Sequence, residues 1–184
     1  MEITLKKNTA SLVILTMSIG MGILFIASFA SPTDLYLANA QQNKTLIQSN
    51  DVEEKNKALV LEALDTLFNQ RDYAAAERYW SPDYIQHSTI VPPGRDGLFS
   101  LVKSSQPTLK YEPGIIVADG DFVIVQGRFS GIGQPQNMIA ADIFHIKDGI
   151  LLEHWDVIQN EATQEQSKSG LPMFGDKFPN NSGQ

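Results

Sequence analysis

The sequence of 184 residues contains no cysteine, which excludes disulfide bonds, thiolate metal sites, thiol catalysis and lipoprotein anchoring. It also has no cluster of lysine and arginine, and its formal net charge is −7. A nucleic-acid-binding surface needs basic side chains that neutralise phosphates, and docking on an anionic membrane needs a basic cluster as well. We therefore expect no nucleic-acid partner, and contact with a membrane only through the N-terminal segment.

Several motifs that would indicate a particular chemistry are missing too. The sequence has no Gly-x-Ser-x-Gly elbow, no phosphate-binding glycine loop and no dinucleotide fingerprint, and it shows no internal repeat. Its hydrophobic content of 42% is typical of a globular protein. The length indicates one ordinary domain with extensions.

The N-terminal 40 residues have the pattern of an export signal. Lys6 and Lys7 precede an uncharged apolar run over residues 10–30, and the small-x-small triplet Ala38-Asn39-Ala40 follows. This order predicts a secretory signal peptide cleaved after Ala40. Because the apolar run is nearly long enough to span a bilayer, an uncleaved membrane anchor is the alternative. Both interpretations place the domain outside the cytoplasm, secreted or anchored.

The rest of the chain divides into three parts by composition. Residues 41–51 are polar and predict a linker. Residues 52–160 alternate between helical and strand-like apolar patterns and form the predicted domain. Residues 161–184 are a polar C-terminal tail, which we expect to be irregular and able to fold over a pocket mouth.

The order of the predicted elements sets the fold class. Apolar periodicity predicts helices over residues 52–68, 73–79 and 96–104, the second capped by Asp72. Asp-Gly turns then separate strands, which we expect at residues 109–118, 122–130, 138–147 and 150–159. Helices followed by antiparallel strands indicate an α+β domain. We expect a curved antiparallel sheet wrapped as a cone around three N-terminal helices, with a central pocket.

Asp142 is the clearest candidate for chemistry. It lies in the middle of an apolar strand, and alternation places it on the same face as Phe144 and Ile146. An apolar environment disfavours the charged form of a carboxylate, which suits a group that exchanges protons near neutral pH. The structural alternative is a carboxylate paired with Arg128 or with tryptophan and tyrosine donors.

The three histidines differ in their surroundings. His87 follows a helix break in an aromatic stretch that includes Trp80 and Tyr84, and such loops often line sites. A satisfied structural histidine is the alternative. His145 falls on the strand face opposite Asp142, where we expect solvent or an interface. His154 lies on the last strand, and periodicity does not decide whether its face or the opposite one points inward.

The opposite face of that last strand carries Trp155 and Gln159. Trp155 is either a pocket wall or ordinary core, and its indole N–H needs a partner, for which Asp142 is a candidate. His154 and Asp156 have a spacing that could supply two metal ligands, but the sequence implies no third one. We therefore predict no metal and expect this pair to be exposed.

Five segments together resemble a known family. They are Tyr84-Ile85-Gln86-His87, Pro93-Gly94-Arg95-Asp96-Gly97-Leu98, Asp142-Ile143-Phe144-His145, Asp148-Gly149 and Glu153-His154-Trp155-Asp156-Val157-Ile158-Gln159. Over residues 53–160 the sequence resembles the SnoaL-like polyketide cyclase group of the nuclear transport factor two-like superfamily. The resemblance implies the same conical fold that the order of elements predicts.

The resemblance also implies a reaction. Cyclases of this group catalyse intramolecular aldol condensation without a metal or organic cofactor, and an Asp at the position of Asp142 is their general acid/base. By this resemblance Asp142 and His87 are the predicted catalytic residues, and His87, Tyr84 or Trp155 would donate hydrogen bonds to a developing oxyanion. The predicted substrate-binding residues are Tyr84, Trp80, Phe144, Trp155 and Gln159.

Three functions stay open from the sequence. The first is a cofactor-free aldol-type cyclase, lyase or isomerase that acts on a small carbonyl compound. The second is a non-catalytic pocket for a small apolar ligand. The third is an interaction module, because domains of this superfamily commonly form homodimers through the outer face of the sheet.

Overall fold

The structure, a computed structural model, describes residues 31–179. The chain forms two compact units, residues 1–47 and residues 48–184. No helix within residues 31–179 is both long and apolar enough to cross a membrane. The apolar run of the predicted export signal lies outside the described residues, so the signal and its cleavage remain predictions.

Four helical elements precede or interrupt the strands. They are α1 (Pro32–Leu64), the π-helix η1 (Asp65–Gln70), α2 (Tyr73–Ala76) and α3 (Gly94–Ser104). The predicted three helices are present, but α1 begins well before the expected start, and the expected linker over residues 41–51 is helical. Its side chains are exposed, as expected for a polar stretch with little to bury.

Within residues 31–179, five strands form one sheet of order β1-β5-β4-β3-β2. Their bounds are β1 (Trp80–Gln86), β2 (Lys110–Asp119), β3 (Phe122–Ser130), β4 (Met138–Lys147) and β5 (Ile150–Asn160). Strands β2 to β5 pair antiparallel in chain order, whereas β1 pairs parallel with β5. The sheet is therefore mixed, which corrects the expectation of a purely antiparallel one.

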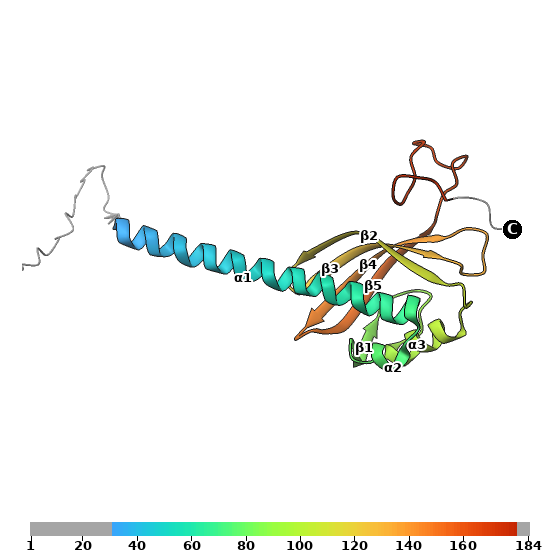
Figure 1. Ribbon diagram of the computed structural model, residues 1–184, viewed down its shortest axis with the longest axis horizontal. Helices are drawn as coiled ribbons and strands as arrows, with labels where there is room; N and C mark the ends of the chain where they lie inside the picture. The colour runs from blue at the N-terminus through green and yellow to red at the C-terminus, as the bar shows by residue number, and fades with distance from the viewer. Residues whose placement is uncertain (1–30, 180–184) are drawn as a thin grey trace, which may run out of the picture. The chain divides into compact units, whose positions relative to one another are not determined.

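Within residues 48–184 the sheet curves over the helices, and the core lies between the two layers (Figure 1). Val60 and Leu67 from the helices, and Val123 and Val125 from β3, are fully buried there. Two asparagines fasten the layers. Asn56 donates to the Gly120 carbonyl at 2.9 Å, and Asn69 exchanges hydrogen bonds with the Tyr111 backbone at 2.9 Å each. These bonds satisfy polar groups that the packed layers would otherwise leave without hydrogen-bond partners.

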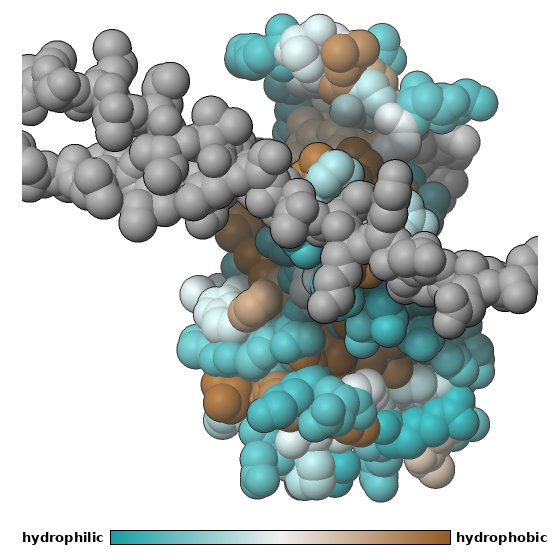
Figure 2. Space-filling model, turned by 90° about the vertical axis from the view of Figure 1, so that its left-hand side faces the viewer, coloured by the Kyte–Doolittle hydropathy of each residue, from teal (hydrophilic) through white to brown (hydrophobic). Residues whose placement is uncertain are grey.

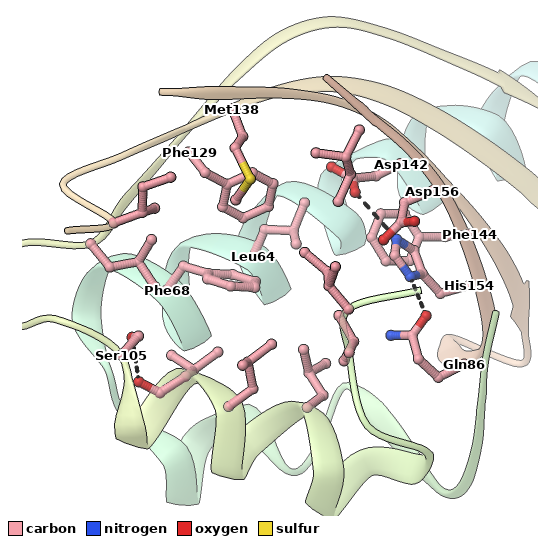
Figure 3. Close-up of a pocket in the computed structure, with 18 of the residues that line it drawn as sticks. Leu64, Phe68, Gln86, Ser105, Phe129, Met138, Asp142, Phe144, His154 and Asp156 are labelled. Carbon is pink, nitrogen blue, oxygen red and sulfur yellow. Dashed lines mark hydrogen bonds and ion pairs between the residues drawn. The ribbon is translucent and has the colours of Figure 1, made fainter. Parts of the chain in front are cut away.

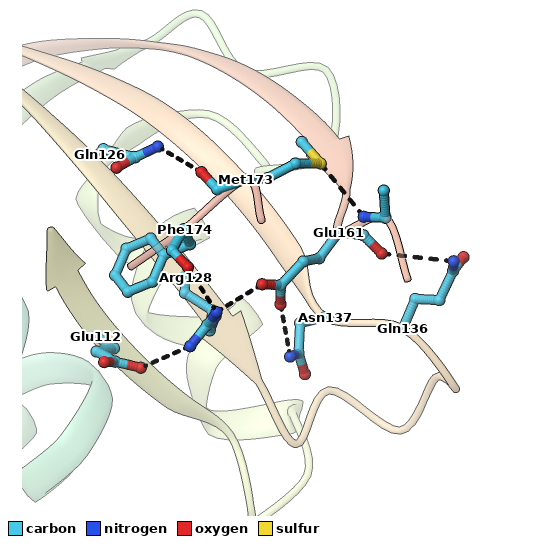
Figure 4. Close-up of polar contacts among 9 residues, drawn as sticks. Glu112, Gln126, Arg128, Gln136, Asn137, Glu161, Met173 and Phe174 are labelled. Carbon is cyan, nitrogen blue, oxygen red and sulfur yellow. Dashed lines mark hydrogen bonds and ion pairs between the residues drawn. The ribbon is translucent and has the colours of Figure 1, made fainter. Parts of the chain in front are cut away.

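The segment that follows β5 packs on the outer face of the sheet, the face opposite the helices (Figure 4). Glu161, which is 1% exposed, accepts a hydrogen bond from the Arg128 guanidinium at 2.6 Å and one from Asn137 at 2.8 Å. The Phe174 ring lies 4.4 Å from the Arg128 guanidinium, and Gln126 donates to the Met173 carbonyl at 2.9 Å. Residues 161–179 of the tail are irregular as predicted, but they cover the outer face instead of a pocket mouth.

The uncovered part of the outer face carries exposed apolar side chains from β2, β3 and β5, namely Ile115, Val117, Phe122, Ile124 and Val157. Figure 2 shows one side of the molecule, where hydrophilic side chains predominate and apolar ones form smaller patches between them. Apolar side chains gathered on one sheet face suit a protein partner. Homodimer formation through this face remains a prediction.

Candidate functional site

A cavity of about 220 Å³ lies between the concave face of the sheet and the helices. Its wall is mostly apolar, with side chains from α1, η1, α3 and the strands, and its aspartates and histidine gather at one end (Figure 3). That end contains Gln86, Asp142, His154 and Asp156. The arrangement is typical of a small-molecule site, in which an apolar body is enclosed and a few polar groups fix its orientation.

Strand register brings the polar residues together. Asp142 of β4 lies directly opposite Asp156 of β5, and Phe144 lies opposite His154. On the other side of β5, the parallel strand β1 places Gln86 beside His154. Because residues opposite each other share a sheet face, all of these side chains point toward the helices.

A chain of hydrogen bonds runs through this group (Figure 3). His154 Nδ1 lies 2.7 Å from Gln86 Oε1, and His154 Nε2 lies 3.3 Å from Asp142 Oδ1. A carbonyl oxygen only accepts hydrogen bonds, so the Gln86 contact places a proton on Nδ1. The Nε2 contact then joins two acceptors unless one of them also carries a proton. The buried pair of His154 (6% exposed) and Asp142 (3% exposed), which we call the dyad, is therefore arranged to share a proton.

The second oxygen of Asp142 has its own partner. Tyr111 of β2 donates from its hydroxyl to Asp142 Oδ2 at 3.2 Å. Burial, and then the Asp142 carboxylate, raise the pKa of Tyr111, so its hydroxyl keeps its proton and remains a donor. Gly127 of β3 makes room for this contact, because a Cβ at that position would overlap the Tyr111 ring. The missing side chain thus lets the tyrosine lie across the sheet toward the carboxylate.

Two further donors in the wall have no partner. Among the described residues, nothing accepts a hydrogen bond from Trp80 Nε1 or pairs with the Tyr84 hydroxyl, although both groups are buried. Burial raises the pKa of Tyr84, and the Asp142 and Asp156 carboxylates add to the effect. The neighbouring Trp80 indole lowers the pKa of Tyr84 in part, although its N–H and the Tyr84 hydroxyl do not form a hydrogen bond. Buried polar groups are nearly always paired, so these two are suited to a bound ligand.

The same cluster could also supply metal ligands. One atom each of Asp142, His154 and Asp156 lies within 4.8 Å of the other two. Two carboxylates and an imidazole are a donor set that suits several divalent ions. The sequence implied only two of these ligands and expected them to be exposed; the structure adds Asp142 as a third and turns the set toward the cavity.

The structure places four predicted site residues in the cavity wall, namely Asp142, Tyr84, Trp80 and Phe144. It places the other three outside. His87 stacks on Trp155 with ring centroids 4.9 Å apart and lies 2.8 Å from Glu153, on the outer face. Gln159 is exposed on the same face of β5 as Trp155. The expectation that these three border the pocket is therefore corrected, and His154 and Asp156 take their place.

A β-bulge explains the correction. Lys147 pairs with Ile150 and Ile146 with Leu151, but His145 pairs with Glu153, so Leu152 is an extra residue in β5. If the regular pairing continued past Leu151 without the bulge, Asp142 would lie opposite Trp155, and Trp155 would face the cavity. A one-residue shift moves every later side chain to the other face.

Sequence reasoning also missed Gln86 and Tyr111 as partners of the dyad. Gln86 belongs to the family segment Tyr84-Ile85-Gln86-His87, which indicates no partner for it. Tyr111 lies on β2, three strands away from β5 in the sheet. The alternation of β1 would have placed Gln86 on the same face as Tyr84. Nothing in the sequence relates Tyr111 to Asp142 without the register of β2 and β3.

Comparison with known proteins agrees with this fold. The family model described as "SnoaL-like domain" matches residues 60–154. A candidate ketosteroid isomerase from Kribbella flavida is similar in structure, with a TM-score of 0.55 and 17% identity, over 69% of this chain and 97% of its own. A candidate polyketide cyclase from Bacillus cereus has a TM-score of 0.50 and 19% identity, over 57% of this chain and 74% of its own.

A search of curated proteins found no significant match. The two solved structures show likeness of fold, and the family model covers just over half of the chain from α1 to the dyad histidine in β5. This chain belongs to the SnoaL-like domain family.

Proposed function

We propose that the domain is a cofactor-free acid/base enzyme of the aldol, lyase or isomerase type that acts on a small carbonyl compound. The observation that carries the proposal is the buried contact between His154 Nε2 and Asp142 Oδ1 at the polar end of an otherwise apolar cavity. Two acceptors that can share a proton in a site of low polarity can take this proton from one substrate atom and return it to another.

Asp142 is the group that would take the proton. Its Oδ2 is held by Tyr111 and its Oδ1 faces His154, so the carboxylate has a fixed orientation at the cavity wall. A carbon acid next to the carbonyl group loses its proton to this carboxylate. His154, whose Nδ1 proton is held by Gln86, balances the charge change by sharing the proton. The same pair then returns the proton to a different atom of the enolate that has formed, which gives the product.

The negative charge that develops on the carbonyl oxygen needs donors. The Tyr84 hydroxyl and Trp80 Nε1 line the cavity and have no partner among the described residues. Because the raised pKa of Tyr84 keeps its hydroxyl protonated, it can donate throughout the reaction. Each such donor contributes roughly 2.7–4 kcal/mol to the stabilisation of an oxyanion in a dry site.

The proposal is tested by hydrogen exchange at carbon. Small cyclic ketones are incubated with the protein in D₂O, and deuterium incorporation next to the carbonyl is followed by NMR. We expect exchange with the wild type and a loss of at least about a hundredfold for Asp142→Asn, the size typical of general acid/base catalysis. His87→Gln on the outer face is the matched control and should exchange like the wild type.

A non-catalytic ligand pocket is the competing function, favoured by the apolar majority of the cavity wall. It predicts that a ketone binds with measurable affinity to the wild type and to Asp142→Asn alike and that neither protein exchanges its hydrogens. That result would refute the enzyme proposal while leaving the cavity as a binding site.

A further inference from the structure

Asp156 is the ionisable carboxylate of the cavity lining that the proposed proton chemistry does not use. It lies on β5 opposite Asp142 and lines the same polar end. Asp142 has Tyr111 and His154 as partners, whereas Asp156 makes no hydrogen bond and no ion pair with any other described residue. Its carboxylate is only partly exposed. A carboxylate in this position lacks the partner that such groups usually have.

The charges of the cavity wall are unbalanced. Its lining includes two aspartates and one histidine, but no lysine or arginine. Even with a proton on His154, one negative charge remains without a counter-charge. An uncompensated charge in an apolar wall is unfavourable, and a bound group of opposite sign relieves it. The same negative excess repels an anionic ligand.

Tyr84 provides a second, independent indication of a ligand at this end. Its side chain is 3% exposed, lines the cavity, and has a hydroxyl without a partner among the residues described. Tyr84, Asp142 and Asp156 all line this one cavity. A phenol oxygen accepts hydrogen bonds as well as donating them. Two acceptors, the Tyr84 oxygen and the Asp156 carboxylate, are therefore available to one group with several N–H donors.

We propose that the cavity selects a small apolar compound that carries a protonated amine, and that Asp156 determines this specificity by accepting hydrogen bonds from the ammonium group. The inference rests on the proposed function, since it names the class of compound for that same site: an amine-bearing carbonyl compound as substrate. The cavity is larger than an engineered one of about 150 Å³ that binds benzene. A six-membered ring with one short polar arm therefore fits.

The experiment compares three ligands of one skeleton by isothermal titration calorimetry on the full chain. They are cyclohexylmethylamine, cyclohexylmethanol and cyclohexanecarboxylate, which differ only in charge and in hydrogen-bonding capacity. We expect the amine to bind about tenfold or more tightly than the alcohol, as a charge-assisted hydrogen bond is about twice as strong as a neutral one. The carboxylate should not bind measurably.

Variants then identify the responsible group. Asp156→Asn should weaken amine binding by about tenfold and leave alcohol binding within about twofold, because only the charge is removed. Asp156→Glu should keep the preference for the amine. Asp121→Asn, which alters an exposed turn residue, is the matched control and should behave like the wild type. If Asp156→Asn does not fold, the ranking of the three ligands on the wild type still decides.

Either of two kinds of result would overturn the proposal. One kind concerns the ligands: the alcohol binds as tightly as the amine or more tightly, or Asp156→Asn keeps the preference for the amine. The other is stabilisation by zinc chloride alone that is lost in Asp156→Asn, together with no effect of the amine, which would identify a metal site. Failure of the proposed enzyme function is distinguishable, because it appears as absent deuterium exchange and does not affect the ranking of ligand affinities.

Discussion

The two faces of the sheet each carry a histidine–carboxylate contact, but the two contacts differ in burial. On the inner face His154 and Asp142 are 6% and 3% exposed and lie 3.3 Å apart. On the outer face the side chains of His87 and Glu153 are 43% and 24% exposed and lie 2.8 Å apart. The outer pair is shorter, yet water screens it. Burial, and not distance, decides how strongly the two members of each pair interact.

The largest expected loss of stability follows from breaking the inner pair. His154→Ala removes the partner of a buried carboxylate and should lower the free energy of unfolding by about 3 kcal/mol. His87→Ala removes an exposed partner and should change it by less than about 1 kcal/mol. Urea denaturation followed by circular dichroism measures both. Equal losses for the two variants would contradict the distinction between the faces.

A second prediction asks whether the face itself matters or only the burial. The pair of Arg128 and Glu161 lies on the outer face, but the C-terminal segment covers it and Glu161 is 1% exposed. Glu161→Gln should therefore cost about 2–3 kcal/mol, similar to the inner pair. Glu112, the exposed second partner of Arg128, provides the control. Glu112→Gln should cost less than about 1 kcal/mol in the same urea titration.

Gly127→Ala tests the close contact between Gly127 and the Tyr111 ring on the inner face of the sheet. The added methyl group would overlap the Tyr111 ring and should destabilise the protein by about 1–3 kcal/mol, as overpacking does. It should also reduce deuterium exchange by displacing the Tyr111 hydroxyl from Asp142. The double variant Gly127→Ala/Tyr111→Leu should recover most of the lost thermal stability but not the exchange. No recovery of stability would mean that the ring is not the group that the methyl meets.

The smallest effect concerns an exposed carboxylate far from either pair. Hydrogen bonds from Asn69 and Gln70 lower the pKa of Asp65. A carboxyl group with a lowered folded-state pKa stabilises the fold above its ordinary value of 3.8 and loses that contribution as the pH falls through the folded-state pKa. Asp65→Asn should thus cost less than about 0.5 kcal/mol at pH 7, and the difference should vanish in strong acid. Thermal unfolding at several pH values tests it.

Much of the fold followed from local pattern. The strands from residue 109 onward lie within one residue of their expected bounds, and the helix capped by Asp72 begins where expected, since Asp-Gly turns and capping are local signals. That helix ends at Ala76, three residues earlier than predicted. The parallel pairing of β1 with β5 could not be predicted, because it joins segments about 70 residues apart. The start of α1 was missed because an exposed polar helix has no apolar stripe.

The candidate site was only half predictable for a related reason. Asp142 stood out as a charged residue in an apolar strand, and alternation alone gave its face. The inward face of β5 depends on the bulge at Leu152, which leaves no clear signal in the sequence. His154 and Asp156 were therefore noticed, but the sequence could not place them. Tyr111 reaches Asp142 only because Gly127 lacks a side chain.

The position of β5 has a consequence for how the chain matures. It lies between β1 and β4, although within residues 31–179 it is the last strand to be synthesised. Until it inserts, the nascent molecule has two additional open strand edges, one on β1 and one on β4, which can recruit other chains. A protein truncated before residue 150 should consequently aggregate rather than persist as a smaller folded unit. Strand β5 thus supplies the dyad histidine and also covers the strand edges through which the nascent sheet would pair with other chains.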